Sequence, residues 1–125
     1  MRVLGKDISV ALLVLFVGAY AFAALSAEDV YFGDCRHYSR PVEINAKKVF
    51  MAIPSYREIV EKSIPANSAL YMLKLDEANK TFKRAVKAYA EENMCDLVCE
   101  EGRIKGASNI TDEVIAKIET ENRKK

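Results

Sequence analysis

The side chains best able to carry chemistry are three cysteines and a single histidine. Cys35 and His37 lie close together beside Asp34, so a Cys/His nucleophilic pair can be drawn from them. No Gly-rich phosphate loop, paired-carboxylate motif or metal-ligand spacing accompanies them, and such neighbours in an irregular segment are most often incidental. We therefore predict that the protein is not an enzyme and that it uses neither a metal nor a cofactor.

The cysteine spacing limits which disulfides can form. Cys95 and Cys99 bound a run, Cys95-Asp96-Leu97-Val98-Cys99, that is typical of a strand. Four residues of strand rise about 13 Å, beyond the roughly 7 Å limit between Cα atoms in a disulfide, so these two cannot bridge each other. Three alternatives stay open: both are small buried hydrophobic residues, Cys35 bonds to one of them, or the set forms a metal or redox site, to which C-x3-C without a nearby His is poorly suited.

The N-terminus of this 125-residue chain has the order of a secretory signal. A short basic start, Arg2 and Lys6, precedes the uncharged residues 8–25, and small residues suited to a signal peptidase follow, with cleavage expected after Ala23 or Ala27. These eighteen uncharged residues also lie near the lower limit of about 17–25 for a membrane-spanning helix, so a retained anchor is the alternative to a cleaved signal. In both cases the rest of the chain faces an extracytoplasmic space.

The charge balance excludes one class of partner. The formal net charge is +1 for the whole chain, and without residues 1–27 the chain is close to neutral. A nucleic-acid binder held by counterion release needs a concentrated basic face, so we expect no nucleic-acid partner.

The first half of the mature chain predicts a strand and two short helices. Residues 28–40 have no clear periodicity and are interpreted as an extended lead. Pro41 opens a short edge strand over residues 42–44, and Asn45 suits the N-cap of a helix over residues 46–52. Pro54 interrupts this helix and starts a second one over residues 55–62, and residues 64–68 form a turn. The inward residues of the second helix are expected to be Tyr56, Ile59 and Val60.

Residues 69–93 predict one long helix. Bulky and small side chains recur along it at alternating steps of four and three, the stripe of a helix packed along a partner. The stripe is formed by Tyr71, Leu75, Ala78, Phe82, Ala85 and Tyr89. A solitary helix of this length needs something to cover its stripe, so these residues are expected to pack a helical hairpin or an oligomer. A basic flank lies off the stripe and is interpreted as a solvated face, comprising Lys80, Lys83, Arg84 and Lys87.

After residue 93 the hydrophobic period changes from 3.6 to 2. Residues 95–100 predict a strand, residues 101–102 a tight turn and residues 103–105 a returning strand. Thr111 is expected to cap a final helix that buries Val114, Ile115 and Ile118. The fold class is therefore α+β: a small antiparallel or mixed three-stranded sheet with a short, coiled-coil-like helical hairpin and a C-terminal helix.

Residues 82–119 resemble the C-terminal half of the Skp/OmpH family of periplasmic chaperones. The sequence motifs typical of that half of the family correspond here to Ala85-Val86-Lys87 with Ala90, then Asp96-Leu97-Val98, then Asn109-Ile110-Thr111 with Val114. Residues 42–50 are similar to the family's first strand and following helix start, so the resemblance assigns residues 41–125 to one domain. It implies a periplasmic homotrimer whose helical arms enclose unfolded outer-membrane proteins.

Two departures from the family bear on function. Only about 30 residues separate Phe50 from Phe82, so the arm is a stub, and the mature chain is neutral where the family members are strongly basic. The first hypothesis is an ATP-independent periplasmic chaperone that shields apolar segments of envelope proteins near the hairpin tip. The client-binding residues would be Tyr56, Ile64, Leu70 and Tyr71, rimmed by Lys62 and Lys74; the competing interpretation places them in the hairpin or trimer core.

The second hypothesis is a structural or assembly oligomer of the cell envelope without general holdase activity. In this case the arm has shrunk because no client cavity is required. A membrane would be contacted only through residues 8–25, if they are retained as an anchor.

Overall fold

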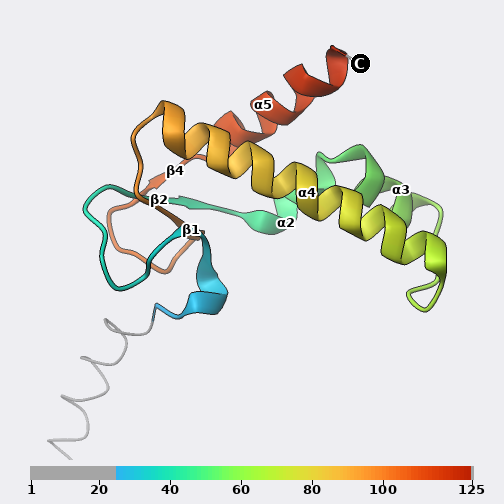
Figure 1. Cartoon of the computed structure of the whole chain (residues 1–125), viewed down its shortest axis with the longest axis horizontal. Helices are drawn as coiled ribbons and strands as arrows, with labels where there is room; N and C mark the ends of the chain where they lie inside the picture. The colour runs from blue at the N-terminus through green and yellow to red at the C-terminus, as the bar shows by residue number, and fades with distance from the viewer. Residues whose placement is uncertain (1–24, 125) are drawn as a thin grey trace, which may run out of the picture.

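The computed structural model describes residues 25–124, which fold around one mixed sheet and one long helix (Figure 1). The elements in chain order are the 3-10 turn η1 (Ala27–Asp29), β1 (Val30–Gly33), β2 (Pro41–Ile44), α2 (Ala46–Met51), α3 (Pro54–Glu61), α4 (Ala69–Glu92), β3 (Leu97–Glu100), β4 (Ser108–Asn109) and α5 (Thr111–Arg123). The predicted α+β class is confirmed. The predicted signal or anchor, apart from its last residues, lies outside the described residues.

The sheet has four strands rather than three, in the order β1-β3-β2-β4. β3 pairs antiparallel with β1 and parallel with β2, and β2 pairs parallel with β4. The strand at residues 42–44 was predicted correctly, but it lies inside the sheet and not at its edge. Pro41 is tolerated there because it is the first residue of the strand, where the missing N–H costs least.

The hairpin return predicted over residues 103–105 is wrong. Residues 101–106 form turns and bends, with Gly102 and Gly106 at φ values of +83° and +84°. The antiparallel place beside β3 is taken by β1, which lies within the lead predicted to be extended but not assigned to the sheet. Tyr31 explains this outcome: its hydroxyl donates to Glu100 Oε1 at 2.7 Å, and its ring meets Phe82 edge-on at 5.2 Å.

β3 begins at Leu97, two residues later than predicted. The carboxylate of Asp96 holds the end of the loop before β2: it accepts the backbone N–H of Arg40 at 2.8 Å and that of Ser39 at 2.7 Å. These hydrogen bonds lower the pKa of Asp96, with the Arg40 N–H the largest cause. Cys95 consequently lies outside the strand.

The starts of α2 and α3 follow their predictions, and the start of α4 has a cap that was not predicted. Asn45 Oδ1 accepts the backbone N–H of Lys48 at 3.1 Å, and Pro54 occupies the first turn of α3, where its lack of a donor is harmless. At the start of α4, Ser68 Oγ accepts the backbone N–H of Tyr71 at 3.1 Å.

The start of α5 differs from its prediction. Thr111 is the first helical residue and not the cap, which is Ile110; Asn109 Oδ1 accepts the backbone N–H of Thr111 at 3.0 Å. The Thr111 hydroxyl accepts the backbone N–H of Asn45 at 2.9 Å, so it ties the start of α5 to the start of α2. Val114 and Ile118 are buried as predicted, whereas Ile115 is half-buried.

A row of aromatic rings connects the sheet to the helices. Phe82 of α4 stacks on Phe50 of α2 at 4.6 Å, and Phe50 meets Tyr56 of α3 at 5.4 Å. Tyr31 of β1 completes the row against Phe82. The core therefore lies between the sheet and the C-terminal two-thirds of α4, and the α3–α4 hairpin extends away from it (Figure 1).

Candidate functional site

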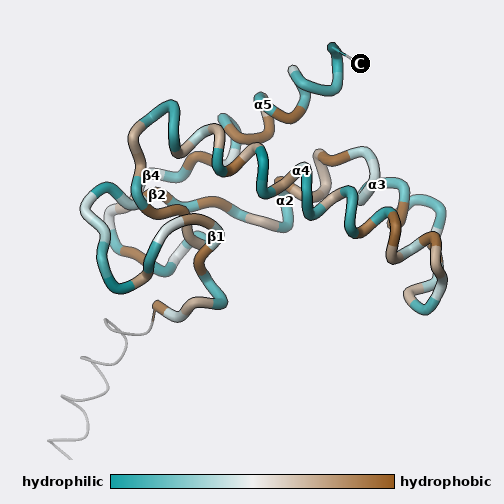
Figure 2. Tube along the Cα trace, in the orientation of Figure 1, coloured by the Kyte–Doolittle hydropathy of each residue, from teal (hydrophilic) through white to brown (hydrophobic). Residues whose placement is uncertain are grey.

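Several exposed apolar side chains lie at the free end of the α3–α4 hairpin. α3 has eight residues and runs beside the first half of α4, joined to it by the loop over residues 62–68 (Figure 1). Four large apolar side chains on these helices are about half exposed or more: Val60 at 48%, Leu70 at 49%, Met72 at 61% and Leu73 at 59%. We call this set the hairpin patch; Figure 2 shows hydrophobic segments at this end of α4.

Helix geometry explains why these side chains are not covered. The stripe of α4 directs Tyr71 and Leu75 toward the rest of the molecule, and both are half-buried. Leu70, Met72 and Leu73 fall one or two steps of 100° away from that stripe, on sides where α4 has no complete neighbour. The first turn of α4 is therefore apolar on more sides than the fold covers.

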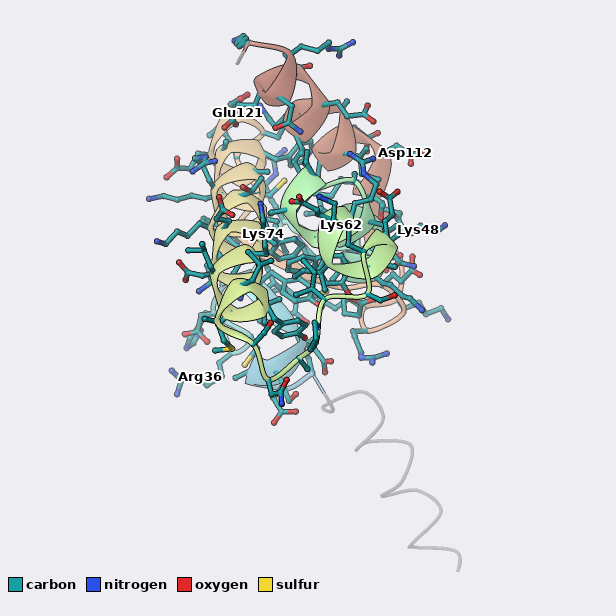
Figure 3. The ribbon with its side chains drawn as sticks, turned by 90° about the vertical axis from the view of Figure 1, so that its right-hand side faces the viewer. Arg36, Lys48, Lys62, Lys74, Asp112 and Glu121 are labelled. Atoms are coloured by element: carbon teal, nitrogen blue, oxygen red, sulfur yellow. The ribbon has the colours of Figure 1, made fainter. Side chains whose placement is uncertain are left out.

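An ion-pair network fixes the hairpin. Glu58 of α3 accepts Lys74 Nζ of α4 at 2.8 Å and Lys62 Nζ at 2.9 Å. The two lysines, labelled in Figure 3, approach from facing sides of the hairpin. Their hydrogen bonds, that of Lys74 first, lower the pKa of Glu58 to about 2. The lysines predicted to rim a client site are thus already engaged by Glu58.

The predicted client-binding residues divide into two groups. Leu70 is exposed, as a client-binding role requires, whereas Tyr56, Ile64 and Tyr71 are half-buried. Tyr56 packs on Phe50, so it fits the competing interpretation, which places these residues in a core. The structure therefore brings only Leu70 of the predicted set into the hairpin patch.

Val60 corrects a prediction, since it was assigned inward and is exposed. Ile59 fills the buried position of α3, at 7% exposure, and Val60 follows it one step around the helix. Met72 and Leu73 were missed in the sequence. The sequence does contain a signal for their exposure: all four residues of the run Leu70-Tyr71-Met72-Leu73 are apolar or aromatic. A helix with one buried stripe needs apolar residues only every three or four positions.

The stripe predicted to pack a hairpin or oligomer is covered within one chain. Ala78, Phe82 and Ala85 are buried, and Leu75 and Tyr89 are half-buried. The elements in contact with α4 are α3, α5, α2, β1 and β3. Covering this stripe therefore does not require a second subunit.

The three cysteines are free thiols in the structure, so a bond from Cys35 to Cys95 or Cys99 is not formed in it. Cys99 is fully buried, and burial raises its pKa to about 11; burial likewise raises the pKa of the half-buried Cys95. Both thiols are therefore poor nucleophiles. Next to Cys35, the Asp34 carboxylate accepts the backbone N–H of Arg36 at 2.9 Å and is paired with the Arg36 side chain.

Residues 25–124 contain neither a metal-binding cluster nor a membrane-spanning helix. No group of three or more His, Cys, Asp or Glu side chains there is arranged to hold a metal ion. In the same part of the chain, no helix has both the length and the apolar character needed to cross a membrane.

Comparison with known proteins adds no relative to this description. No family model matches the chain, and no curated protein or solved structure matches it either. A functional proposal for this chain therefore rests on the fold, the hairpin patch and the resemblance seen in the sequence.

Proposed function

We propose that the protein is an extracytoplasmic, ATP-independent binding protein of the Skp/OmpH type that shields apolar segments of envelope proteins. The observation that carries the proposal is the hairpin patch: four large apolar side chains, each about half exposed or more, gathered at the end of the hairpin away from the sheet. Isolated exposed apolar residues are ordinary, but several on one short element mark a surface for a partner.

The chemistry of the patch suits varied clients. Leu70, Met72, Leu73 and Val60 carry no hydrogen-bonding side-chain group, so they impose no sequence code on an apolar segment. Methionine is flexible and polarizable, which lets a surface adapt to differently shaped side chains. Such a patch binds each client weakly, so useful affinity would come from several subunits acting together, as in the proposed homotrimer.

The length of the arm sets the mode of binding. Eight residues of α3 span about 12 Å, which is far shorter than an arm able to surround a client. We therefore propose that the patch covers short segments of a client and does not enclose the whole chain.

Light scattering of a denatured outer-membrane protein, diluted with and without the full-length protein, tests the proposal. We expect suppression of aggregation at molar excess, and loss of suppression in the double variant Met72→Ser, Leu73→Ser. Met94→Ser is the matched control, because Met94 is 72% exposed but follows the far end of α4. No suppression by the unmodified protein, or equal loss in the control, would reject the hairpin patch as a client site.

A second candidate function is an assembly module of the envelope that holds one specific partner. The observation that favours it is the short α3, since a protein without an enclosing arm needs no client cavity. Intact mass of the exported protein would separate the candidates in part, because retention of residues 1–27 as an anchor favours the assembly module.

A further inference from the structure

A groove lies between α4 and α5. It is a cavity of about 380 Å³, lined by residues of both helices and by Lys124, the C-cap of α5. Its small lining residues are Ala85 and Ala88 of α4 and Ala116 and Thr120 of α5. The distance at which two helices pack depends on the side chains between them, so small residues here allow another helix to come close.

The charged residues of the groove alternate in sign. They are Glu113, Lys117, Glu121 and Lys124, at steps of four, four and three, so they share one face of α5. An antiparallel copy of this helix presents the same signs in reverse order, and each charge then meets its opposite. A parallel copy would place like charges together. Charges beside a helix contact set the choice and orientation of the partner in this way.

The two outer charges have no partner among the described residues. Lys117 is paired with Glu92, and Glu121 is paired with Arg84 at 3.2 Å. By contrast, Glu113 and Lys124 are exposed and form no ion pair within residues 25–124. The charges that are free to meet another molecule are thus of opposite sign and lie at opposite ends of one face of the helix.

We infer that a second copy of the chain occupies this groove, with the two α5 helices antiparallel and Glu113 of each copy opposite Lys124 of the other. Such a contact is isologous, so a twofold axis makes the two ion pairs equivalent. The axis would pass near the middle of α5, between Ala116 and Thr120 and their copies, where the helices come closest. The inference goes beyond the proposed function and uses none of the hairpin patch, so it applies to two single chains or to two of the proposed trimers.

The size of the contact predicts weak association. α5 has thirteen residues and is about 20 Å long, so one helix pair covers less than the roughly 800 Å² per partner of a standard stable interface. The assembly should therefore depend on protein concentration.

Sedimentation velocity of the full-length protein over a range of concentrations at low salt tests the inference. We expect an assembly with an even number of chains. Glu113→Lys and Lys124→Glu each place like charges opposite one another, and each should raise the dissociation constant about tenfold or more. An equimolar mixture of these two variants should associate again, because the new lysine of one then faces the new glutamate of the other.

Two further variants serve as controls. Asp112→Lys makes the same charge change in the first turn of α5, but Asp112 does not line the groove. Asp112→Lys should leave the association unchanged, as should Met72→Ser with Leu73→Ser in the hairpin patch. Loss of the assembly in either control would overturn the inference.

The remaining outcomes are equally decisive. A protein that stays monomeric at every concentration, a trimer that both reversals leave intact, or a mixture that fails to associate would overturn the inference. If a reversal does not fold, salt added to the unmodified protein should weaken the assembly by screening the exposed pairs, and an assembly insensitive to salt would contradict the inference. Suppression of client aggregation is measured separately, so failure here leaves the test of the hairpin patch untouched.

Discussion

The two parts of α4, before and after Ala78, both carry several apolar side chains but have opposite surroundings. From Ala78 onward the helix lies against the sheet, α2 and α5, and buries Phe82, Ala85, Val86 and Ala90. Before Ala78 its principal neighbour is the short α3, and Leu70, Met72 and Leu73 remain exposed. One amphipathic helix can thus be a core element at one end and carry exposed apolar side chains at the other, depending on how many neighbours the fold supplies.

The largest expected effect comes from truncating the buried half. Phe82→Ala removes a ring that contacts both Phe50 and Tyr31, and we expect it to lower the free energy of unfolding by about 3–5 kcal/mol. Leu73→Ala, in the exposed half, should change it by less than about 0.5 kcal/mol. Urea unfolding of both variants measures the difference. Similar losses would show that the two halves are equally buried in solution.

The next largest loss of stability is expected from a glycine substitution in the sheet, at Gly33 in β1. A Cβ at Gly33 would lie 2.1 Å from the Asp96 carbonyl oxygen, and φ is +95°. Gly102 has a similar φ of +83° but open space around it. We expect Gly102→Ala to cost about 1 kcal/mol from backbone strain, and Gly33→Ala to cost more because the chain must also shift. Thermal unfolding compares them, and equal costs would exclude the close contact with Asp96.

Each region also holds a carboxylate whose lowered pKa makes its stability depend on pH. The folded pKa of Glu58 is about 2, below its usual 4.5, so its contribution is complete above pH 4.5 and is lost as the pH falls toward 2. Glu58→Gln should remove this acid-dependent loss. Hydrogen exchange of the α3 and α4 amides at pH 3 and pH 6 provides the measurement.

Asp96 supplies the matched case on the sheet side. Its folded pKa is also lowered, so its contribution is present above its usual value of 3.8 and disappears below it. Asp96→Asn should alter exchange in β3 and in residues 39–40 but not in the hairpin. Identical exchange patterns for the two variants would show that the regions do not respond separately.

The smallest expected effect is at the two helix ends. Ser63 follows α3 with φ +49° and Met94 follows α4 with φ +58°, both in the left-handed region that glycine adopts without strain. Ser63→Gly and Met94→Gly should each stabilise the protein by up to about 1 kcal/mol. Chemical denaturation of each variant measures the gain, and destabilisation by either would show that the native side chain makes a contact that outweighs the strain.

Much of the fold could be predicted because local signals agreed with the final packing. Asn45, Pro54 and the stripe from Tyr71 to Tyr89 set the helix boundaries through capping, a fixed φ and periodicity. The strand β1 could not be predicted in this way. Its place depends on the contact of Tyr31 with Glu100 and Phe82, which lie far along the chain, and no local pattern marks such a pairing.

The candidate site was predicted only in part for a similar reason. Leu70 is exposed near the hairpin tip as expected, but exposure depends on which neighbours are missing, and periodicity does not report missing neighbours. Val60 was therefore assigned inward, and Met72 and Leu73 were overlooked. The ion pairs of Glu58 with Lys62 and Lys74 join residues whose alignment depends on the hairpin register, which composition alone does not fix.

The central claim is that clients bind to the exposed half of α4. Methyl NMR of the full-length protein, titrated with an unfolded outer-membrane protein, tests it most directly. We predict that signals of Leu70, Met72, Leu73 and Val60 shift or broaden, while those of Met94 and the buried Val114 stay unchanged. Perturbation confined to Met94, or no perturbation at client excess, would contradict it.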